Sequence, residues 1–187
     1  MKSYIVATTE PVFTPEQCDI VIKSGKEQPK QKAQVGLGSK LEQGELNVET
    51  RIAHVSWIPF DKLSDMYKKI EKTMKGANDH CFGFDGMQIS EPAQYTEYPE
   101  GGFYDWHVDS DVHFIDKPLV RKISMTLLLS PENEFEGGDL ELMKDGVIKL
   151  KQGQAVFFAS FIRHRVKKII KGNRKSLVMW FSGTPFK

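Results

Sequence analysis

Apolar residues recur at helical spacing in two stretches of the first half of the chain, and each stretch carries helix boundary signals. Thr14 stands at an N-cap position with Gln17 three residues later, which forms a capping box, and Gly25 follows as a helix stop. The second stretch covers about residues 60–75 and predicts a helix that ends at Gly76. Its apolar stripe consists of Leu63, Met66, Tyr67, Ile70 and Met74. We therefore predict two amphipathic helices.

From residue 87 onward the pattern changes to short apolar segments, each ended by Gly, Pro, Asn or Asp. These segments are 88–98, 103–108, 122–130, 139–143, 147–150, 155–158, 165–170 and 176–181. An earlier segment, 51–57, alternates apolar and polar positions as a half-buried strand does. Short strands at this spacing are typical of a β-sandwich or barrel. We predict a mainly β fold with flanking helices, in which both helices pack on one face of the sheet and the open end of the barrel holds the site.

Residues 28–45 are rich in Gln, Lys and Gly and almost free of large apolar side chains. Such a segment can bury little surface, so it predicts a mobile loop. Two interpretations of this loop are open. It either closes over the barrel mouth as a lid when substrate binds, or it is an ordinary surface loop.

Length and composition narrow the class of protein. The 187 residues fit one domain, and the formal net charge of +1 gives little support for a nucleic-acid partner. No apolar run approaches the roughly 20 residues of a membrane helix, and the N-terminal apolar stretch is too short for a signal peptide. Cys18 and Cys81 are the only cysteines, which excludes a disulfide framework. We therefore expect a cytoplasmic, single-domain protein.

A candidate metal site begins with His107 and Asp109, which are separated by one residue within a predicted strand. Side chains at this spacing point to the same face, about 6.5–7 Å apart, and can take adjacent positions on one ion. This pair occurs easily by accident and is weak alone. His164 follows the apolar segment 155–158. Two histidines and one carboxylate on a β framework make the facial triad of non-haem Fe(II) oxygenases, which leaves positions open on the iron.

A second candidate lies ten residues beyond His164, where Arg174 opens the last predicted strand. A guanidinium that points into the same barrel could bind a carboxylate through two hydrogen bonds. An arginine at a strand start is also common as a solvated surface residue. Both interpretations stay open on this residue alone.

Several segments together resemble a known family. Residues 98–109 read YPEGGFYDWHVD, and they are followed by RKISMTLLLS at 121–130, EGGDL at 136–140, HRV at 164–166 and Arg174. In this order they resemble the 2-oxoglutarate/Fe(II)-dependent dioxygenases, in particular the prolyl 4-hydroxylase-like branch with its PKHD-type hydroxylases. The resemblance implies a double-stranded β-helix (jelly-roll) core over 87–182, within one domain of 1–187. Residues 1–86 would then form a helical support with a mobile loop.

The resemblance also assigns roles to individual residues. Metal binding falls on His107, Asp109 and His164. Binding of the distal 2-oxoglutarate carboxylate falls on Arg174, a hydrogen bond to this cosubstrate on Tyr98, and an aromatic pocket wall on Trp180. Some prolyl hydroxylases carry a second carboxylate-binding tyrosine on the strand that corresponds to 122–130, where this sequence has Thr126. Thr126 and Tyr98 are therefore alternative partners of Arg174.

The implied activity is hydroxylation of a substrate C–H bond with Fe(II), 2-oxoglutarate and O2, releasing succinate and CO2, with L-ascorbate as a candidate reductant. The implied substrate is peptidyl proline in a peptide or protein, and a free amino acid, another protein side chain or a small molecule is the alternative. A cupin-like binding module without turnover is a further alternative, against which the triad and Arg174 argue. A nucleic-acid demethylase finds little support in the net charge.

The remaining candidates have ordinary structural explanations. Asp111 and His113 continue the alternation of His107 and Asp109 and could extend it to a zinc site, but Ser110 marks the strand end, which favours a rim position for His113. We expect His54 to be structural and His80 to be solvated. The basic residues in 163–171 alternate with apolar ones, which predicts a strand with one solvated face or, alternatively, a cationic rim.

Overall fold

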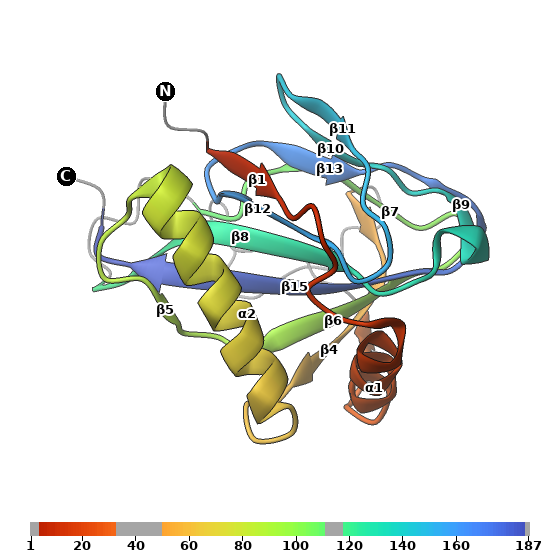
Figure 1. Ribbon diagram of the computed structural model, residues 1–187. Coiled ribbons are helices and arrows are strands. Elements are labelled where there is room, and N and C mark those ends of the chain that lie inside the picture. The colour runs from red at the N-terminus through yellow and green to blue at the C-terminus, as the bar shows by residue number, and fades with distance from the viewer. Residues whose placement is uncertain (1–3, 33–49, 111–117, 186–187) are drawn as a thin grey trace.

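The computed structural model of the chain describes residues 4–32, 50–110 and 118–185. Two helices, α1 (Pro15–Lys26) and α2 (Ser64–Ala77), lie against one face of a large antiparallel sheet (Figure 1). A single π-helical turn, η1 (Asn78–Phe82), continues α2, and a 3-10 turn, η2 (Glu132–Glu134), lies later in the chain. None of the helices in these described ranges combines the length and apolar character that crossing a membrane requires.

The strands form two facing sheets and one short ribbon. The larger sheet runs β1 (Ile5–Ala7), β12 (Ala155–Ala159), β8 (Val120–Leu128), β15 (Arg174–Gly183), β6 (Ala93–Tyr98), β4 (His54–Ile58) and β2 (Gln31–Lys32), with β5 (Gln88–Ile89) also paired to β15. The smaller sheet runs β11 (Gly146–Ile148), β10 (Leu140–Leu142), β13 (His164–Val166), β7 (Phe103–His107) and β3 (Arg51–Ile52). The ribbon pairs β9 (Phe135–Gly137) with β14 (Ile169–Gly172). All pairings are antiparallel, as in a jelly roll.

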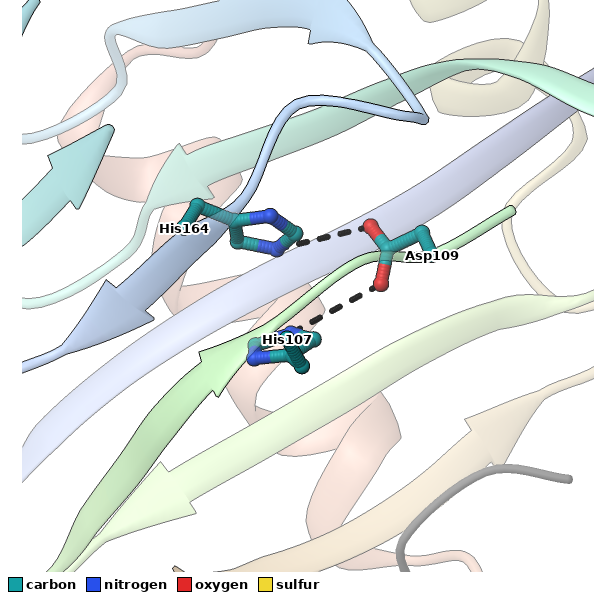
Figure 2. A group of neighbouring side chains, drawn as sticks. All are labelled: His107, Asp109 and His164. Carbon is teal, nitrogen blue, oxygen red and sulfur yellow. Dashed lines mark ion pairs between the residues drawn. The ribbon is translucent and has the colours of Figure 1, made fainter. Parts of the chain in front are cut away.

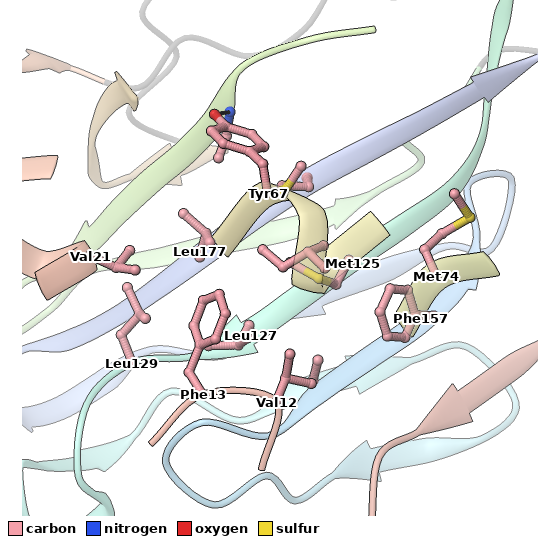
Figure 3. Packing of buried hydrophobic residues seen from close by; sticks show 14 of the residues in the cluster. Val12, Phe13, Val21, Tyr67, Met74, Met125, Leu127, Leu129, Phe157 and Leu177 are labelled. Carbon is pink, nitrogen blue, oxygen red and sulfur yellow. Dashed lines mark hydrogen bonds between the residues drawn. The ribbon is translucent and has the colours of Figure 1, made fainter. Parts of the chain in front are cut away.

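Period-two alternation gives the larger sheet two different faces. On β15, Leu177, Met179 and Phe181 point toward the helices and join one apolar cluster. This cluster also holds Val21 of α1, Tyr67 and Met74 of α2, and Met125, Leu127 and Phe157 of the sheet (Figure 3). A second, smaller cluster fills the space between the two sheets and includes Tyr98, Leu140, Val156, Phe158 and Val166. Apolar side chains therefore fill part of the space between the two sheets.

The capping box predicted for the first helix is present, with the Gln17 amide bonded to Thr14 Oγ1 at 3.3 Å and the Thr14 amide bonded to Gln17 Oε1 at 3.1 Å. The prediction that Gly25 stops this helix is wrong, because α1 continues to Lys26. A Cβ added at Gly25 would lie 2.3 Å from Cγ of Tyr95. Gly25 therefore serves the close approach of α1 to β6 and not the helix end.

The boundaries predicted for the second helix are also wrong. The helix begins at Ser64 and not near residue 60, and it passes Gly76 into η1 until Gly83, which adopts a left-handed φ of 67°. Asn78 secures this extension, since its side chain accepts a hydrogen bond from the Phe84 amide and donates one to the Phe84 carbonyl, both 2.9 Å long. The extension keeps Phe82 in the core. Helical periodicity marks the apolar stripe but not these capping contacts.

The predicted strands are present, and three of them are divided. Segment 88–98 splits into β5 and β6, 165–170 lies across β13 and β14, and 51–57 splits into β3 and β4. The short strands β1, β2 and β9 were not predicted, because three or fewer residues carry no usable alternation. Of the predicted loop 28–45, the structure describes only residues 28–32, and β2 within them pairs with β4. The rest of that loop, and with it the lid hypothesis, lies outside the described residues.

Candidate metal centre

Three side chains from two distant segments of the sequence meet at one end of strands β7 and β13 of the smaller sheet (Figure 2). His107 ends β7 and His164 begins β13, and the two are direct register partners on adjacent strands. Asp109 lies two residues beyond the end of β7, where its amide donates to the Ser160 carbonyl at 3.0 Å. One ligand atom from each of the three side chains lies within 4.8 Å of the others. The predicted triad is therefore assembled, although Asp109 stands after the strand and not within it.

Hydrogen bonds orient both imidazoles in the same way. Nδ1 of His107 lies 2.7 Å from the Asp105 carbonyl, and Nδ1 of His164 lies 2.9 Å from the Ile162 carbonyl. A carbonyl only accepts hydrogen bonds, so each Nδ1 carries the proton and each Nε2 is left with a lone pair. Second-coordination-sphere contacts of this kind orient the histidine ligands of metal sites.

The two free Nε2 atoms point at the carboxylate. They lie 3.7 Å and 3.5 Å from the two oxygens of Asp109, from His107 and His164 respectively. Lone pairs on three buried acceptors repel one another unless a cation lies among them. The donor set, two imidazole nitrogens and one carboxylate with one side free, fits a divalent iron ion.

Charge at the site also favours a metal. Burial and, to a smaller extent, the neighbouring His164 lower the pKa of His107 to about 3, so His107 is neutral at physiological pH. Burial alone would raise the pKa of Asp109, but His164 and His107 outweigh that effect and hold it below its ordinary value. Neutral imidazole and ionised carboxylate are the protonation states that ligate a metal.

Two further residues hold Asp109. Ser124 on β8 donates to Asp109 Oδ2 at 2.7 Å and also lies 2.9 Å from the Ser160 hydroxyl. The indole N–H of Trp180 contributes to the low pKa of Asp109, although its Nε1 atom is buried without full hydrogen-bond geometry to any described residue. The predicted pocket residue Trp180 is thus placed beside the metal ligand. Ser124 was not predicted, since only the pairing of β8 with β15 and β12 brings it there.

Arg174 is the first residue of β15 and is only 3 % exposed. Its Nη1 donates to the hydroxyl of Ser176 at 3.3 Å, and its Cζ lies 5.8 Å from the ring centroid of Tyr98, its register partner. Within the described ranges, no carboxylate forms a salt bridge with this guanidinium. A buried cation without an anionic partner fits an incoming carboxylate.

The structure also settles where the other predicted residues lie. Thr126 is buried on β8, but no hydrogen bond joins it to Arg174 in the described part of the chain. Ser176 was not predicted, and its signal in the sequence was the period of two that places it on the same face as Arg174. His54 is half-buried, and burial lowers its pKa. His80 is exposed as predicted but belongs to η1, and His113 lies outside the described residues.

Comparison with known proteins shows what the chain is similar to. A sequence profile of the 2OG-Fe(II) oxygenase superfamily matches residues 93–182, just under half of the chain. Over these residues the chain is similar to the 2OG-Fe(II) oxygenase superfamily. It is 29% identical over 123 residues to a PKHD-type hydroxylase from Colwellia psychrerythraea, a match that covers 63% of this chain and 55% of that protein. The chain thus spans about half the length of the curated relatives that it matches.

Solved structures of this superfamily share the fold. The viral collagen prolyl hydroxylase of Paramecium Bursaria Chlorella virus-1, in its 2-oxoglutarate complex, superposes with a TM-score of 0.74 at 18% identity and covers 97% of both chains. A prolyl hydroxylase from Trichoplax adhaerens, solved with a hypoxia-inducible-factor peptide fragment, superposes with a TM-score of 0.65 at 17% identity. That match covers 95% of this chain and 83% of the Trichoplax chain. The predicted jelly-roll fold is confirmed, and strands from the first 86 residues pair within its sheets.

Proposed function

We propose that this oxygenase hydroxylates a peptidyl proline, using Fe(II), 2-oxoglutarate and O2 and releasing succinate and CO2. The observation that carries the proposal is the pair of Nε2 lone pairs aimed at the oxygens of Asp109 from 3.7 and 3.5 Å. Support for the prolyl substrate comes from the matched prolyl hydroxylase structures, one of which holds a peptide fragment.

In this proposal, His107, Asp109 and His164 hold the iron, and Arg174 holds the distal carboxylate of 2-oxoglutarate. When bound, iron with 2-oxoglutarate and O2 would supply the oxidising power that breaks the substrate C–H bond. Tyr98 and Ser176 flank the guanidinium, and Thr126 is the alternative partner. L-Ascorbate is the proposed reductant that would keep the iron divalent.

The protein itself would bind, orient and exclude water. The apolar cluster between the two sheets includes Tyr98, the register partner of Arg174, and Phe158, whose ring meets that of His164. A water-poor chamber strengthens the attraction between the guanidinium and a carboxylate, and it protects reactive species from side reactions. Trp180 would form the wall nearest to Asp109. We also propose that residues 1–187 act as one domain, and that its compartment is the cytoplasm, since both cysteines are free.

Turnover of 2-oxoglutarate tests the enzymatic proposal. Succinate formation should require Fe(II) and should fall to background in the Asp109→Ala variant, while the exposed Asp145→Ala variant should retain it. A protein that binds 2-oxoglutarate but forms no succinate under any condition would instead be a binding module.

The substrate needs a separate test. Proline-containing peptides are incubated with the enzyme and searched by mass spectrometry for the addition of one oxygen atom. Addition at proline supports the proposal. Addition at another side chain, or on a free amino acid, moves the enzyme to the alternative substrate class.

A further inference from the structure

Strand β7 is irregular just before the metal ligand. Its pairing with β13 sets His107 opposite His164 and Tyr104 opposite Val166, so three steps on β7 match two on β13. This extra residue is a β-bulge, which turns side chains that regular alternation would separate onto the same face. The bulge therefore brings the rings of Tyr104 and His107 together inside the barrel.

The two rings stack closely, and an arginine covers the far side of the stack. The ring centroids of Tyr104 and His107 lie 3.4 Å apart with an interplanar angle of 14°. Arg51 on β3 is the register partner of Tyr104, and its Cζ lies 4.3 Å from the tyrosine ring centroid. The Arg51 side chain is also bonded across the barrel, since Nη2 donates to Gln94 Oε1 on β6 at 3.1 Å. The guanidinium of Arg51, the ring of Tyr104 and the imidazole of His107 thus form a column of three planar groups that ends at the proposed metal ligand.

The other faces of the two histidine ligands are covered differently. His107 also meets His164, with ring centroids 4.1 Å apart. His164 in turn meets Phe158 of the larger sheet edge-on, with centroids 4.6 Å apart. His164 is therefore held by the apolar core, whereas His107 depends on the column from β3.

We propose that Tyr104 and Arg51 are positioning residues for His107. The hydrogen bond from Nδ1 to the Asp105 carbonyl fixes one edge of the imidazole, and contact with the Tyr104 ring face stops the ring from turning about that bond. Arg51 contacts the ring of Tyr104 through a cation–π interaction, and its hydrogen bond to Gln94 connects it to the larger sheet. The inference rests on the proposed metal site.

The chain offers a matched control on the same strand. Trp106 lies on the outer face of β7 and carries its own arginine, with Arg165 Cζ 4.7 Å from the ring centroid of Trp106. Arg165 is bonded to Glu141 on β10, so this second arginine–aromatic pair is also anchored. Within the described residues, neither side chain of this pair makes a hydrogen bond, ion pair or ring contact with His107, Asp109 or His164. Loss of the outer pair perturbs the same strand without touching the imidazole.

The test measures Co(II) binding, because Co(II) replaces Fe(II) at such sites without oxidising. The full chain, stripped of metal, is titrated and its visible absorption spectrum recorded. Tyr104→Leu should weaken Co(II) binding about 10–100-fold, as loss of a second-coordination-sphere contact does. Tyr104→Phe keeps the ring stack and should bind Co(II) with an affinity within about threefold of wild type. Arg51→Met should lower the Co(II) affinity several-fold, as expected from the loss of a cation–π contact. Trp106→Leu should bind as wild type.

The outcomes separate the two proposals. If the wild-type protein leaves the absorption spectrum of aqueous Co(II) unchanged, both the proposed metal site and this inference are wrong. A wild-type protein that binds Co(II), with a folded Tyr104→Leu variant that binds it equally well, overturns the positioning role alone. If Tyr104→Phe and Tyr104→Leu lost Co(II) affinity equally, the hydroxyl of Tyr104 and not its ring would be responsible. That result would also overturn the proposed positioning by ring contact. The thermal unfolding of each metal-free variant shows that it is folded.

Discussion

The two faces of the larger sheet carry different chemistry on the same strands. Toward the helices, β8 and β15 present Met125, Leu127, Leu177 and Met179, which are fully or almost fully buried. Toward the smaller sheet, the same strands present Ser124, Thr126, Arg174 and Ser176, which are buried as well. Burial is therefore equal on the two faces, and only polarity differs. The helix face stabilises the fold. On the inner face, Ser124 is bonded to Asp109, and Arg174 is bonded to Ser176.

Loss of the buried guanidinium should have the largest effect on the inner face. Arg174→Ala should weaken 2-oxoglutarate binding by about 3–5 kcal/mol, because a carboxylate is left buried without its cation. Co(II) affinity should change little, since Arg174 contacts none of the triad residues. Titration of the Co(II)-loaded protein with 2-oxoglutarate measures both quantities, and unchanged cosubstrate affinity would remove Arg174 from the site.

A variant on the opposite face should give the reverse result. Leu127→Ala should lower the free energy of unfolding by about 2–5 kcal/mol through the cavity that it leaves under the helices. Affinity for 2-oxoglutarate should stay near that of wild type at temperatures where the variant is folded. Urea denaturation measures the first quantity. If cosubstrate affinity fell in parallel with stability, the two faces would not be functionally separate.

Acid should destabilise the metal-free protein through the inner face. Between the folded pKa of His107, about 3, and its ordinary value of 6.5, the folded protein binds fewer protons than the unfolded chain. The free energy of unfolding therefore falls as the pH falls through this window, by up to about 1.4 kcal/mol per pH unit. His107→Asn should flatten this dependence, and replacement of the exposed His80 by Asn should not. Urea denaturation from pH 7 to pH 4 measures it.

The smallest expected effect distinguishes the partners of Arg174. Ser176→Ala should weaken 2-oxoglutarate binding by about 1 kcal/mol, the size of one hydrogen bond, because Ser176 is bonded to the guanidinium. Thr126→Val, which keeps the side-chain shape, should leave the affinity unchanged. The opposite ranking of these two variants would assign the shared carboxylate contact to Thr126.

The sequence predicted those parts of the site that depend on spacing along one strand. The i, i+2 spacing and the order of motifs identified His107, Asp109, His164 and Arg174, although Asp109 stands beyond the end of β7. The parts that were missed depend on register between strands or on local irregularity. Ser124 reaches Asp109 from a strand whose pairing the sequence does not state, and the bulge that stacks Tyr104 on His107 breaks the alternation on which the prediction rested.

Helix boundaries were missed for a similar reason. Glycine after an apolar stripe predicts a helix stop at Gly25 and Gly76, but the structure continues the helix at both residues. Gly25 is required by the ring of Tyr95, a residue seventy positions away. A single sequence does not distinguish a glycine that is needed for close packing from a glycine that is needed for a turn. Contacts between distant segments decide between them.

Gly138 shows how the buried Arg174 limits sequence change at a neighbouring position. A Cβ there would lie 3.0 Å from Cδ of Arg174 and 2.2 Å from Ile169, and its φ of 66° is unfavourable for other residues. The adjacent Gly137 has a φ of 78°, and its Cβ would lie 2.5 Å from the Lys168 carbonyl. Random mutagenesis under selection for 2-oxoglutarate turnover should therefore recover almost no replacement at either glycine, while neighbouring Glu136 drifts freely. A relative that has lost Gly138 should also have lost the arginine beside it.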